Sequence, residues 1–374
     1  MMSVVIERID TLIVDLPTIR PHKLAMATMS KQSSVIVRLY SSDGLVGLGE
    51  AATIGGLSYG PESPEGMKLT IDQYLAPLLL GQLADNIQAL RARMNAYVKG
   101  NSFAKNALET ALLDAQGLRL GVPVSTLLGG AIQSHLPVLW VLASGDTDKD
   151  IAEAKDMMAR GRHKNFKLKI GARSVAADVA HVAKIKAALQ DDGCEIRVDV
   201  NQAWTEAQAV VGMRGLQDAG IDLVEQPVPA QQHDVLARLS QRFDIPILAD
   251  ESVATATDGF ALAKQGCARA FALKIAKSGG PMGALELAHV AMAAGIDLYG
   301  GTMLEGSIAT AASVHAYATL SPMAWGTELF SPLLLVDDIV TTPMTYADFG
   351  VTVPTGPGLG LSLDEDKVKF YQRA

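Results

Sequence analysis

The chain has 374 residues, of which 49% are hydrophobic and 19% charged; this composition is typical of a globular protein with a large core and excludes disordered, collagen-like and coiled-coil classes. The length allows two or three domains, or one large domain with a smaller companion. The net charge of −8 and the lack of a long basic run indicate that nucleic acid is not a partner.

Residues 4–60 have the pattern of β-strands. Apolar residues alternate loosely over residues 4–14, and the runs 34–40 and 45–51 flank the turn Ser42-Asp43-Gly44. A glycine-containing turn between two such runs is typical of a hairpin, so we expect these two runs to pair.

Helical spacing replaces the strand pattern over residues 64–120. Within this region Asn101 is a candidate N-cap for a helix that ends near Gly117 and Gly121. Strands followed by helices predict an α+β N-terminal domain over residues 1–130.

Short apolar runs that end in polar residues recur beyond Gly130. Counted at positions 143, 169, 199, 225, 250, 274, 299 and 328, successive ends are 24 to 30 residues apart. The eight runs are residues 136–143, 166–169, 196–200, 223–225, 247–250, 272–275, 297–299 and 325–328. Helical patterns separate them, for example over residues 175–189 and 281–294, so each strand should lie parallel to the next. Eight such units close into a barrel. The sequence therefore predicts an α/β fold: a (β/α)8-type barrel over residues 131–345 with an α+β N-terminal capping domain, completed by the C-terminal segment 346–374.

Three consecutive predicted strands end in a carboxylate, namely Asp199, Glu225 and Asp250. In a β/α barrel the C-terminal strand ends converge on the active site. Three carboxylates there would repel one another unless a cation lay among them, and all-oxygen ligation favours Mg²⁺ or Mn²⁺. One such acid alone is more often a helix N-cap. Three in register favour a metal site.

Lysines face this trio from two other predicted strands. Alternation places Lys167 and Lys169 on the same, inward face of the second strand, and Lys274 on the sixth strand lies across the barrel. A lone Lys-x-Lys is usually a solvated edge strand. Crowded positive charge and burial should lower the pKa of at least one lysine, so that it could act as a base. Glu328, on the eighth strand, should lie close to Lys167 and Lys169.

Other catalytic patterns are missing from the sequence. The seven histidines form no zinc motif and none lies at a predicted strand end, and there is neither a nucleophile elbow nor a phosphate-binding loop. The glycine pairs 279–280 and 300–301 either allow backbone to approach a ligand or form tight turns, and the two interpretations are balanced.

The cysteines and the N-terminal residues indicate that the protein resides in a reducing cytoplasm. Cys194 and Cys267 are 73 positions apart and form no C-x-x-C motif, and charged residues interrupt the first 15 positions, where a signal peptide would need an apolar segment. The charge-free run 306–327 contains His315 and Pro322, so we interpret it as a buried helix plus a loop rather than a membrane span.

Together these residues resemble the enolase superfamily and, within it, the muconate lactonising subgroup. The motifs that carry the resemblance are Lys167-x-Lys169, Asp199 with Asn201, Glu225-Gln226-Pro227, Asp250-Glu251-Ser252, Lys274-Ile275-Ala276-Lys277 and Glu328. It continues through residues 17–24, 53–60, 107–117, 127–130 and 300–306, and so covers essentially the whole chain. A lysine rather than a histidine on the sixth strand distinguishes this subgroup from the mandelate racemases.

The resemblance implies the formation or protonation of an enolate of a carboxylate substrate, here the cycloisomerisation of cis,cis-muconate to muconolactone in bacterial catechol degradation. It implies a Mn²⁺ or Mg²⁺ site formed by Asp199, Glu225 and Asp250. Lys169 would exchange the proton, and Lys167 would lie beside the enolate oxygen. Glu328 would be a further acid or base, with Lys274 on the opposite face.

Specificity should come from cap loops over the barrel mouth, namely Ile54 and Tyr59 in one loop and residues 18–29 in another. Their apolar character suits a flat diene, although such residues are equally common in packing between domains. Further substrate contacts are expected from Asn201, Thr302 and Phe330, and Phe330 could pack on the lactone.

Two other classes of function remain open. One is a sister enzyme such as a dipeptide epimerase or succinylbenzoate synthase, and the other is a catalytically silent binding protein on the same fold. A dipeptide would need acids to hold its ammonium group, whereas residues 327–330 carry Glu328 alone. The intact lysines and acids argue against a silent protein. The expected partner is a small dicarboxylate, without nucleic acid or membrane, and the expected assembly is a homo-oligomer.

Overall fold

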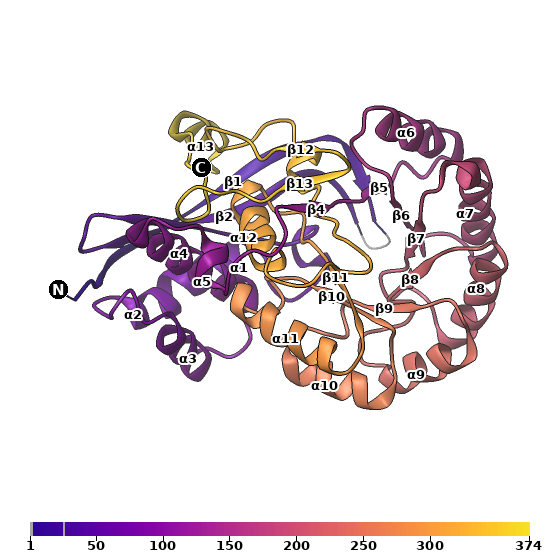
Figure 1. Cartoon of the computed structure of the whole chain (residues 1–374), viewed down its shortest axis with the longest axis horizontal. Coiled ribbons are helices and arrows are strands. Elements are labelled where there is room, and N and C mark those ends of the chain that lie inside the picture. Colours follow the sequence, from indigo (N-terminus) through magenta and orange to yellow (C-terminus); the bar gives the residue numbers. More distant parts are fainter. Residues whose placement is uncertain (1–2, 25–26) are drawn as a thin grey trace.

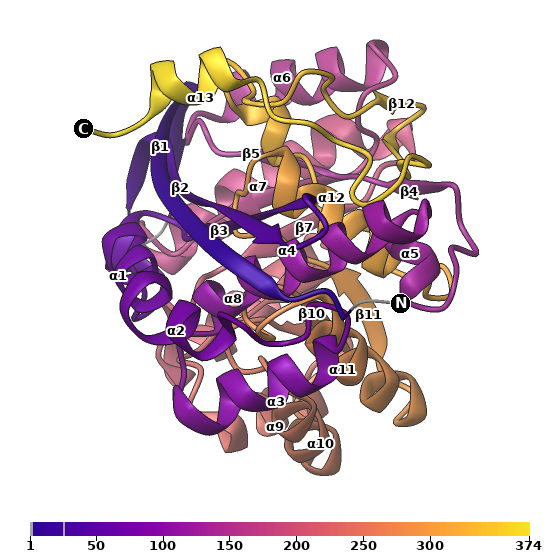
Figure 2. The same ribbon diagram turned by 90° about the vertical axis from the view of Figure 1, so that its left-hand side faces the viewer.

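The N-terminal region forms an antiparallel sheet in the order β1-β2-β3 (Figures 1 and 2). The computed structural model describes residues 3–24 and 27–374. The three strands are β1 (Ile6–Lys23), β2 (Thr28–Ser41) and β3 (Val46–Ala52). The predicted hairpin is confirmed, because β2 pairs with β3 up to Tyr40 opposite Val46 and Gly44 in the turn has a φ of +82°. β1 is longer than predicted because it pairs with β2 nearly to its end.

Helices cover one side of this sheet. They are α1 (Pro64–Thr70), the π-helical turn η2 (Ile71–Leu75), α2 (Ala76–Leu79), α3 (Ile87–Tyr97), α4 (Ser102–Leu120) and α5 (Val124–Leu127), preceded by the short 3-10 turn η1 (Gly56–Ser58). α4 ends at Gly121, as expected. Asn101 is the N-cap residue, as predicted, but its side chain makes no cap hydrogen bond. Instead, Glu62 accepts hydrogen bonds from the amides of Phe103 and Ala104, at 3.1 and 3.2 Å.

Seven parallel strands form the curved sheet of the barrel in the order β11-β10-β9-β8-β7-β6-β5. Their bounds are β5 (Trp140–Leu142), β6 (Phe166–Lys169), β7 (Ile196–Asp199), β8 (Leu223–Glu225), β9 (Ile247–Ala249), β10 (Ala270–Leu273) and β11 (Asp297–Gly300). Figure 1 shows the connecting helices on the outer side of this sheet. They are α6 (Thr147–Ala159), α7 (Val175–Leu189) with the turn η3 (Gln190–Asp192), α8 (Glu206–Asp218), α9 (His233–Arg242), α10 (Ala256–Gln265), α11 (Pro281–Ala293) and α12 (Ser307–Tyr317).

The eighth predicted strand is not a regular strand. Thr327 alone forms β-bridges, on one side to Gly300 of β11 and on the other to Val138. The amide of Thr327 donates to the carbonyl of Pro137 at 3.0 Å, and the amide of Glu328 donates to that of Gly300 at 2.8 Å. Gly326, with a φ of +58°, interrupts the extended backbone just before this point. The segment thus closes the barrel between β11 and Val138 through one bridging residue, and Glu328 follows it directly.

The first predicted strand is divided in two. β4 (His135–Pro137) joins a small antiparallel sheet with β12 (Tyr346–Ala347) and β13 (Gly350–Thr352), and only β5 belongs to the barrel. The C-terminal segment then continues to the cap, where α13 (Glu365–Tyr371) lies beside β1 (Figure 2). The guanidinium of Arg373 donates to the carboxylate of Asp15 at 2.6 Å.

The helical part of the long uncharged run lies inside the protein, whereas Ser321, Pro322 and Ala324 in the following loop are exposed. Every residue of α12 is buried, in agreement with the expectation of a buried helix. Within residues 3–24 and 27–374, no helix is long and apolar enough to cross a membrane. Cys194 and Cys267 are both free and buried.

Candidate active site

The three predicted carboxylates lie at neighbouring strand ends. Asp199 and Glu225 are the last residues of β7 and β8 and are paired in register, and Asp250 directly follows β9. All three are fully buried. The regular parallel ladder therefore carries them to one edge of the sheet, as the spacing of the sequence predicts.

Ammonium groups pair with each carboxylate. Lys167 Nζ lies 2.9 Å from Glu225 Oε2 and also contacts the carboxylate of Glu328. Lys169 Nζ lies 2.5 Å from Asp199 Oδ2. Glu328 therefore lies close to the second barrel strand, as expected, because it contacts Lys167.

Asp250 is held from the other side of the barrel. Lys274 Nζ lies 2.6 Å from Asp250 Oδ2, and Lys277 Nζ lies 2.6 Å from Oδ1. The hydroxyl of Tyr59 donates to Asp250 Oδ2 at 3.1 Å and accepts from Lys274 at 3.1 Å. Tyr59 was expected as an apolar contact, but its polar end belongs to this charged cluster. Gly301 allows Lys274 to approach, because a Cβ there would lie 2.8 Å from the lysine side chain.

The pKa values of two lysines differ from the expected lowering. Burial lowers the pKa of Lys167, but Glu225 and Glu328 outweigh it and raise this pKa well above its usual value. Asp250 does the same for Lys274. Lys277 has a lowered pKa, because there burial outweighs the attraction of Asp250. The pKa values of Lys167 and Lys274 are raised because buried carboxylates lie close to both ammonium groups.

The donor set suits a hard divalent cation. Among the residues that the structure describes, no three His, Cys, Asp or Glu side chains have the geometry of an assembled metal site, because the carboxylates point to the lysines. Glu225 Oε1 is nevertheless buried and has no hydrogen-bond partner within those residues. An unpaired carboxylate oxygen beside two further carboxylates fits oxygen ligation of Mg²⁺ or Mn²⁺. The residues present therefore fit the cation.

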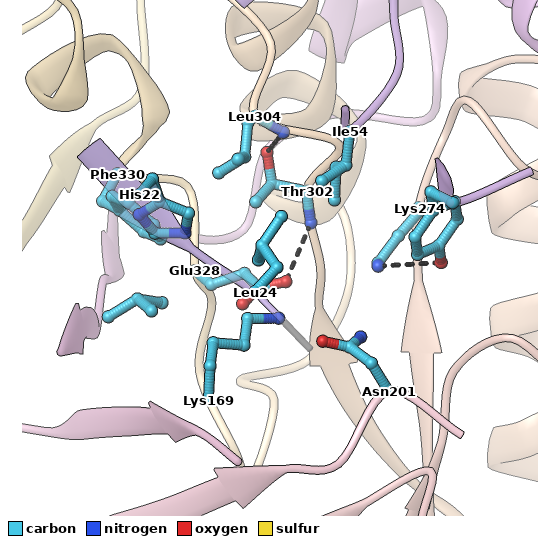
Figure 3. A pocket seen from close by; sticks show the side chains of 12 residues that line it. His22, Leu24, Ile54, Lys169, Asn201, Lys274, Thr302, Leu304, Glu328 and Phe330 are labelled. Atoms are coloured by element: carbon cyan, nitrogen blue, oxygen red, sulfur yellow. Dashed lines mark hydrogen bonds between the residues drawn. The ribbon is translucent and has the colours of Figure 1, made fainter. Parts of the chain in front are cut away.

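A pocket lies between the lysines and the cap. It is lined by all five predicted substrate contacts, Ile54, Tyr59, Asn201, Thr302 and Phe330, and by Lys169, Lys274 and Glu328. Figure 3 shows Lys169 and Asn201 on one side of it and Ile54, Thr302 and Leu304 opposite.

Polar contacts fix two of the lining residues. The side-chain amide of Asn201 donates to Asp199 Oδ2 at 3.2 Å, and the backbone amide of Thr302 donates to Glu328 Oε1 at 3.2 Å. Phe330 packs edge to face on Trp140, with ring centroids 5.0 Å apart.

Four further lining residues had no individual role predicted from the sequence, namely His22, Leu24, Val141 and Leu304. His22 and Leu24 fall within the predicted loop 18–29, of which residues 25 and 26 lie outside the described part of the chain. The predicted loop 18–29 is mostly strand, because β1 includes His22 and ends at Lys23, and β2 begins at Thr28.

Comparison with known proteins reveals close similarity along the whole chain. The family model of the mandelate racemase / muconate lactonizing enzyme N-terminal domain matches residues 8–129, and the enolase C-terminal domain-like model matches residues 149–367. Muconate cycloisomerase 1 of Pseudomonas putida is 56% identical over 100% of both chains, and chloromuconate cycloisomerase of P. putida is 45% identical over 99% of both. The crystal structure of muconate lactonizing enzyme from Pseudomonas fluorescens complexed with muconolactone has a TM-score of 0.98 and 56% identity, covering 99% of this chain and 100% of that chain.

Proposed function

The chain belongs to the mandelate racemase / muconate lactonizing enzyme family of the enolase superfamily, and we propose that it is an isomerase that converts cis,cis-muconate to muconolactone. The observation that carries the proposal is the pocket itself. It combines Lys169 and Glu328 with the apolar residues Ile54 and Phe330, which suits a flat dicarboxylate diene.

Lys169 is the proposed proton donor. In the reaction one carboxylate of the substrate attacks the conjugated diene, a C–O bond forms, and the displaced electron pair moves toward the other carboxylate as an enolate. The α-carbon of this enolate then takes a proton. Lys169 lines the pocket, and its ammonium nitrogen lies 2.5 Å from Asp199 Oδ2, so it is positioned to supply this proton.

Lys167 is proposed to orient and stabilise the enolate carboxylate. It is buried and held in place by Glu225 and Glu328, so its position is preorganised. Glu328 is proposed as a further acid or base through this contact, and Lys274 is proposed to contact the opposite face of the substrate. Lys274 also lines the pocket, across from Lys169 and Phe330 (Figure 3).

A divalent cation, Mn²⁺ or Mg²⁺, is proposed to be held by Asp199, Glu225 and Asp250. Enzymes of this superfamily combine a lysine or histidine base with one or two Mg²⁺ ions. Such an ion, when bound, supplies positive charge that stabilises the enolate. The unpaired Glu225 Oε1 supports this assignment.

The decisive experiment follows the diene absorbance of cis,cis-muconate with the purified protein and Mn²⁺ or Mg²⁺. Rapid bleaching with muconolactone as the product is the expected result, and chelation of the cation should abolish it. Slow bleaching together with fast epimerisation of a dipeptide would instead establish the sister reaction. Residues 327–330, with the single acid Glu328, disfavour that outcome.

We also propose that the enzyme acts in the cytoplasm, in bacterial catechol degradation, as a homo-oligomer. The free, buried cysteines support a reducing compartment. Large apolar side chains are exposed on the cap and its C-terminal helix, namely Leu57, Leu69, Tyr74, Tyr97 and Phe370, which supports association between copies. Light scattering coupled to size-exclusion chromatography should give a mass above that of one chain.

A further inference from the structure

His22 is a buried histidine in the pocket that the mechanism above does not use. It lies near the end of β1 and is 1% exposed. Within the described residues neither of its ring nitrogens has a hydrogen-bond partner. A buried polar group without a partner lowers the stability of the fold, so such a group calls for an explanation.

The other buried histidines do not share this property. His163 Nδ1 lies 2.9 Å from the carbonyl oxygen of Val138, and both ring nitrogens of His315 contact backbone atoms, at 3.4 and 3.2 Å. His181 lies 2.8 Å from the hydroxyl of Thr147. These three histidines have structural roles, whereas His22 is the one that lines the pocket.

The surroundings of His22 keep its imidazole neutral. Burial lowers its pKa to about 3, and the positive charges of Lys169, Arg20 and Lys167 act in the same direction. A neutral imidazole has one N–H donor and one acceptor nitrogen. His22 can therefore donate one uncharged hydrogen bond into the pocket at neutral pH.

His22 lies on the cap side of the pocket, near the end of β1. In the view of Figure 3 it lies on the same side of the pocket as Phe330, and Lys274 lies on the other side. Leu24 and Val141 also line the pocket. If the enolate-forming carboxylate of the substrate lies among the lysines, the second carboxylate must lie elsewhere in the pocket, and His22 is a free donor for it.

We propose that His22 is a substrate-binding residue that donates a hydrogen bond to the carboxylate that closes the lactone ring. This inference rests on the proposed function. During closure this carboxylate forms the new C–O bond and loses its charge, while the displaced electron pair moves to the other carboxylate and Lys169 then supplies the proton. A cationic donor would bind the charged carboxylate more tightly before the reaction than during it, and would so oppose the attack. A neutral donor orients the carboxylate with a smaller penalty.

The test compares His22→Phe, His22→Gln and the control His163→Phe with the wild type. His163 is equally buried and has one unpaired nitrogen, but it does not line the pocket. We expect His22→Phe to lower kcat/KM for cis,cis-muconate about 10- to 100-fold, which corresponds to the loss of a hydrogen bond to a charged group. His22→Gln retains a neutral donor and should recover most of this loss, and His163→Phe should stay within threefold of the wild type.

Two further readouts separate binding from structure. His22→Phe removes two unpaired nitrogens, so its melting temperature should not fall. Its affinity for adipate, an unreactive six-carbon dicarboxylate, should weaken about 10-fold or more in calorimetry. A value of kcat/KM within threefold of the wild type for His22→Phe would overturn the inference, as would equal losses in His22→Phe and His163→Phe.

The proposed function and the inference about His22 can be contradicted independently of each other. A wild-type protein that binds adipate through His22 but does not turn over cis,cis-muconate would contradict the cycloisomerase proposal and retain His22 as a carboxylate-binding residue. A wild-type protein that turns over cis,cis-muconate, with His22→Phe equally active, would support the function and contradict the inference.

Discussion

The barrel side and the cap side of the pocket are built on different physical principles. On the barrel side, carboxylates and ammonium groups alternate at the ends of regular strands, with contacts such as Lys169 to Asp199 at 2.5 Å. On the cap side, Ile54 and Leu24 are apolar and His22 has no polar partner in the described chain. A charged cluster that is paired in advance is suited to chemistry, whereas an apolar wall with one free donor is suited to selecting and orienting a substrate. Changes on the barrel side should therefore stop turnover, and changes on the cap side should alter affinity.

The largest effect is expected from Glu225→Gln. The substitution keeps the shape of the side chain but removes a charge from the proposed cation site, while Lys167 keeps its contact with Glu328. Turnover should fall about 10³-fold or more, because charge stabilisation beside the enolate is lost. Cation content after gel filtration, measured by atomic emission, should fall with it.

Asp114→Asn is the matched control for that substitution. Asp114 is buried in the cap and accepts hydrogen bonds from the amides of Leu48 and Leu359, away from the pocket. Its cation content should equal that of the wild type. Wild-type cation content and turnover in the Glu225→Gln protein would contradict the proposed role of Glu225 in cation binding and catalysis.

A loss of about 10²- to 10⁴-fold in kcat is expected from Lys169→Ala, since a positioned acid or base contributes that much. Incorporation of solvent deuterium into muconolactone should slow in parallel, and Lys164→Ala, on the exposed loop before β6, should leave both rates unchanged. Deuterium incorporation at the wild-type rate in the Lys169 variant would exclude this lysine as the proton donor.

Ile54→Ala should have a smaller effect, mainly on affinity. The truncation removes apolar contact from the cap wall of the pocket, so KM for cis,cis-muconate should rise about 10-fold while kcat changes much less. Leu57→Ala, in the same loop but 66% exposed, should behave as the wild type in steady-state kinetics. If kcat fell in Ile54→Ala as much as in Lys169→Ala, the division between the two sides would be wrong.

The smallest effect on turnover is expected from Glu50→Gln, at the contact between the cap sheet and α12 of the barrel. Glu50, on β3, accepts hydrogen bonds from the amides of Gly306 and Ala309 at the start of α12, at 2.7 and 3.0 Å. Burial raises its pKa from 4.5 to about 7. The stabilising contribution of this group is therefore complete below pH 4.5 and is lost as the pH rises to 7, by about 3 kcal/mol.

Glu50→Gln should lack this dependence and retain most of the activity. Urea unfolding at pH 4.5 and pH 8 should show that the difference in free energy of unfolding between wild type and variant shifts by about 3 kcal/mol, with the wild type favoured at the lower pH. A constant difference would mean that Glu50 is ionised equally in the folded and unfolded states.

The sequence alone predicts most of the barrel and the charged half of the site. Parallel strands have a period of two and are separated by helices of similar length, so Asp199, Glu225 and Lys169 reach the same edge of the sheet from spacing alone. α7 has the predicted bounds for the same reason. Spacing does not predict local backbone conformation. In the eighth predicted strand Gly326 has a positive φ, and Thr327 alone forms β-bridges.

Only the tertiary structure decides what the cap contributes. The side chain of Glu62, rather than that of Asn101, caps α4, because a carboxylate from another segment reaches its free amides. Tyr59 joins the charged cluster through Asp250, and His22 enters the pocket from a strand whose pattern carries no catalytic signal. Likewise, the pKa values of Lys167 and Lys274 depend on the distance and burial of their partners. Periodicity along the chain places residues within one element, whereas contacts between the two domains depend on how distant segments pack, and no local pattern in the sequence encodes that packing.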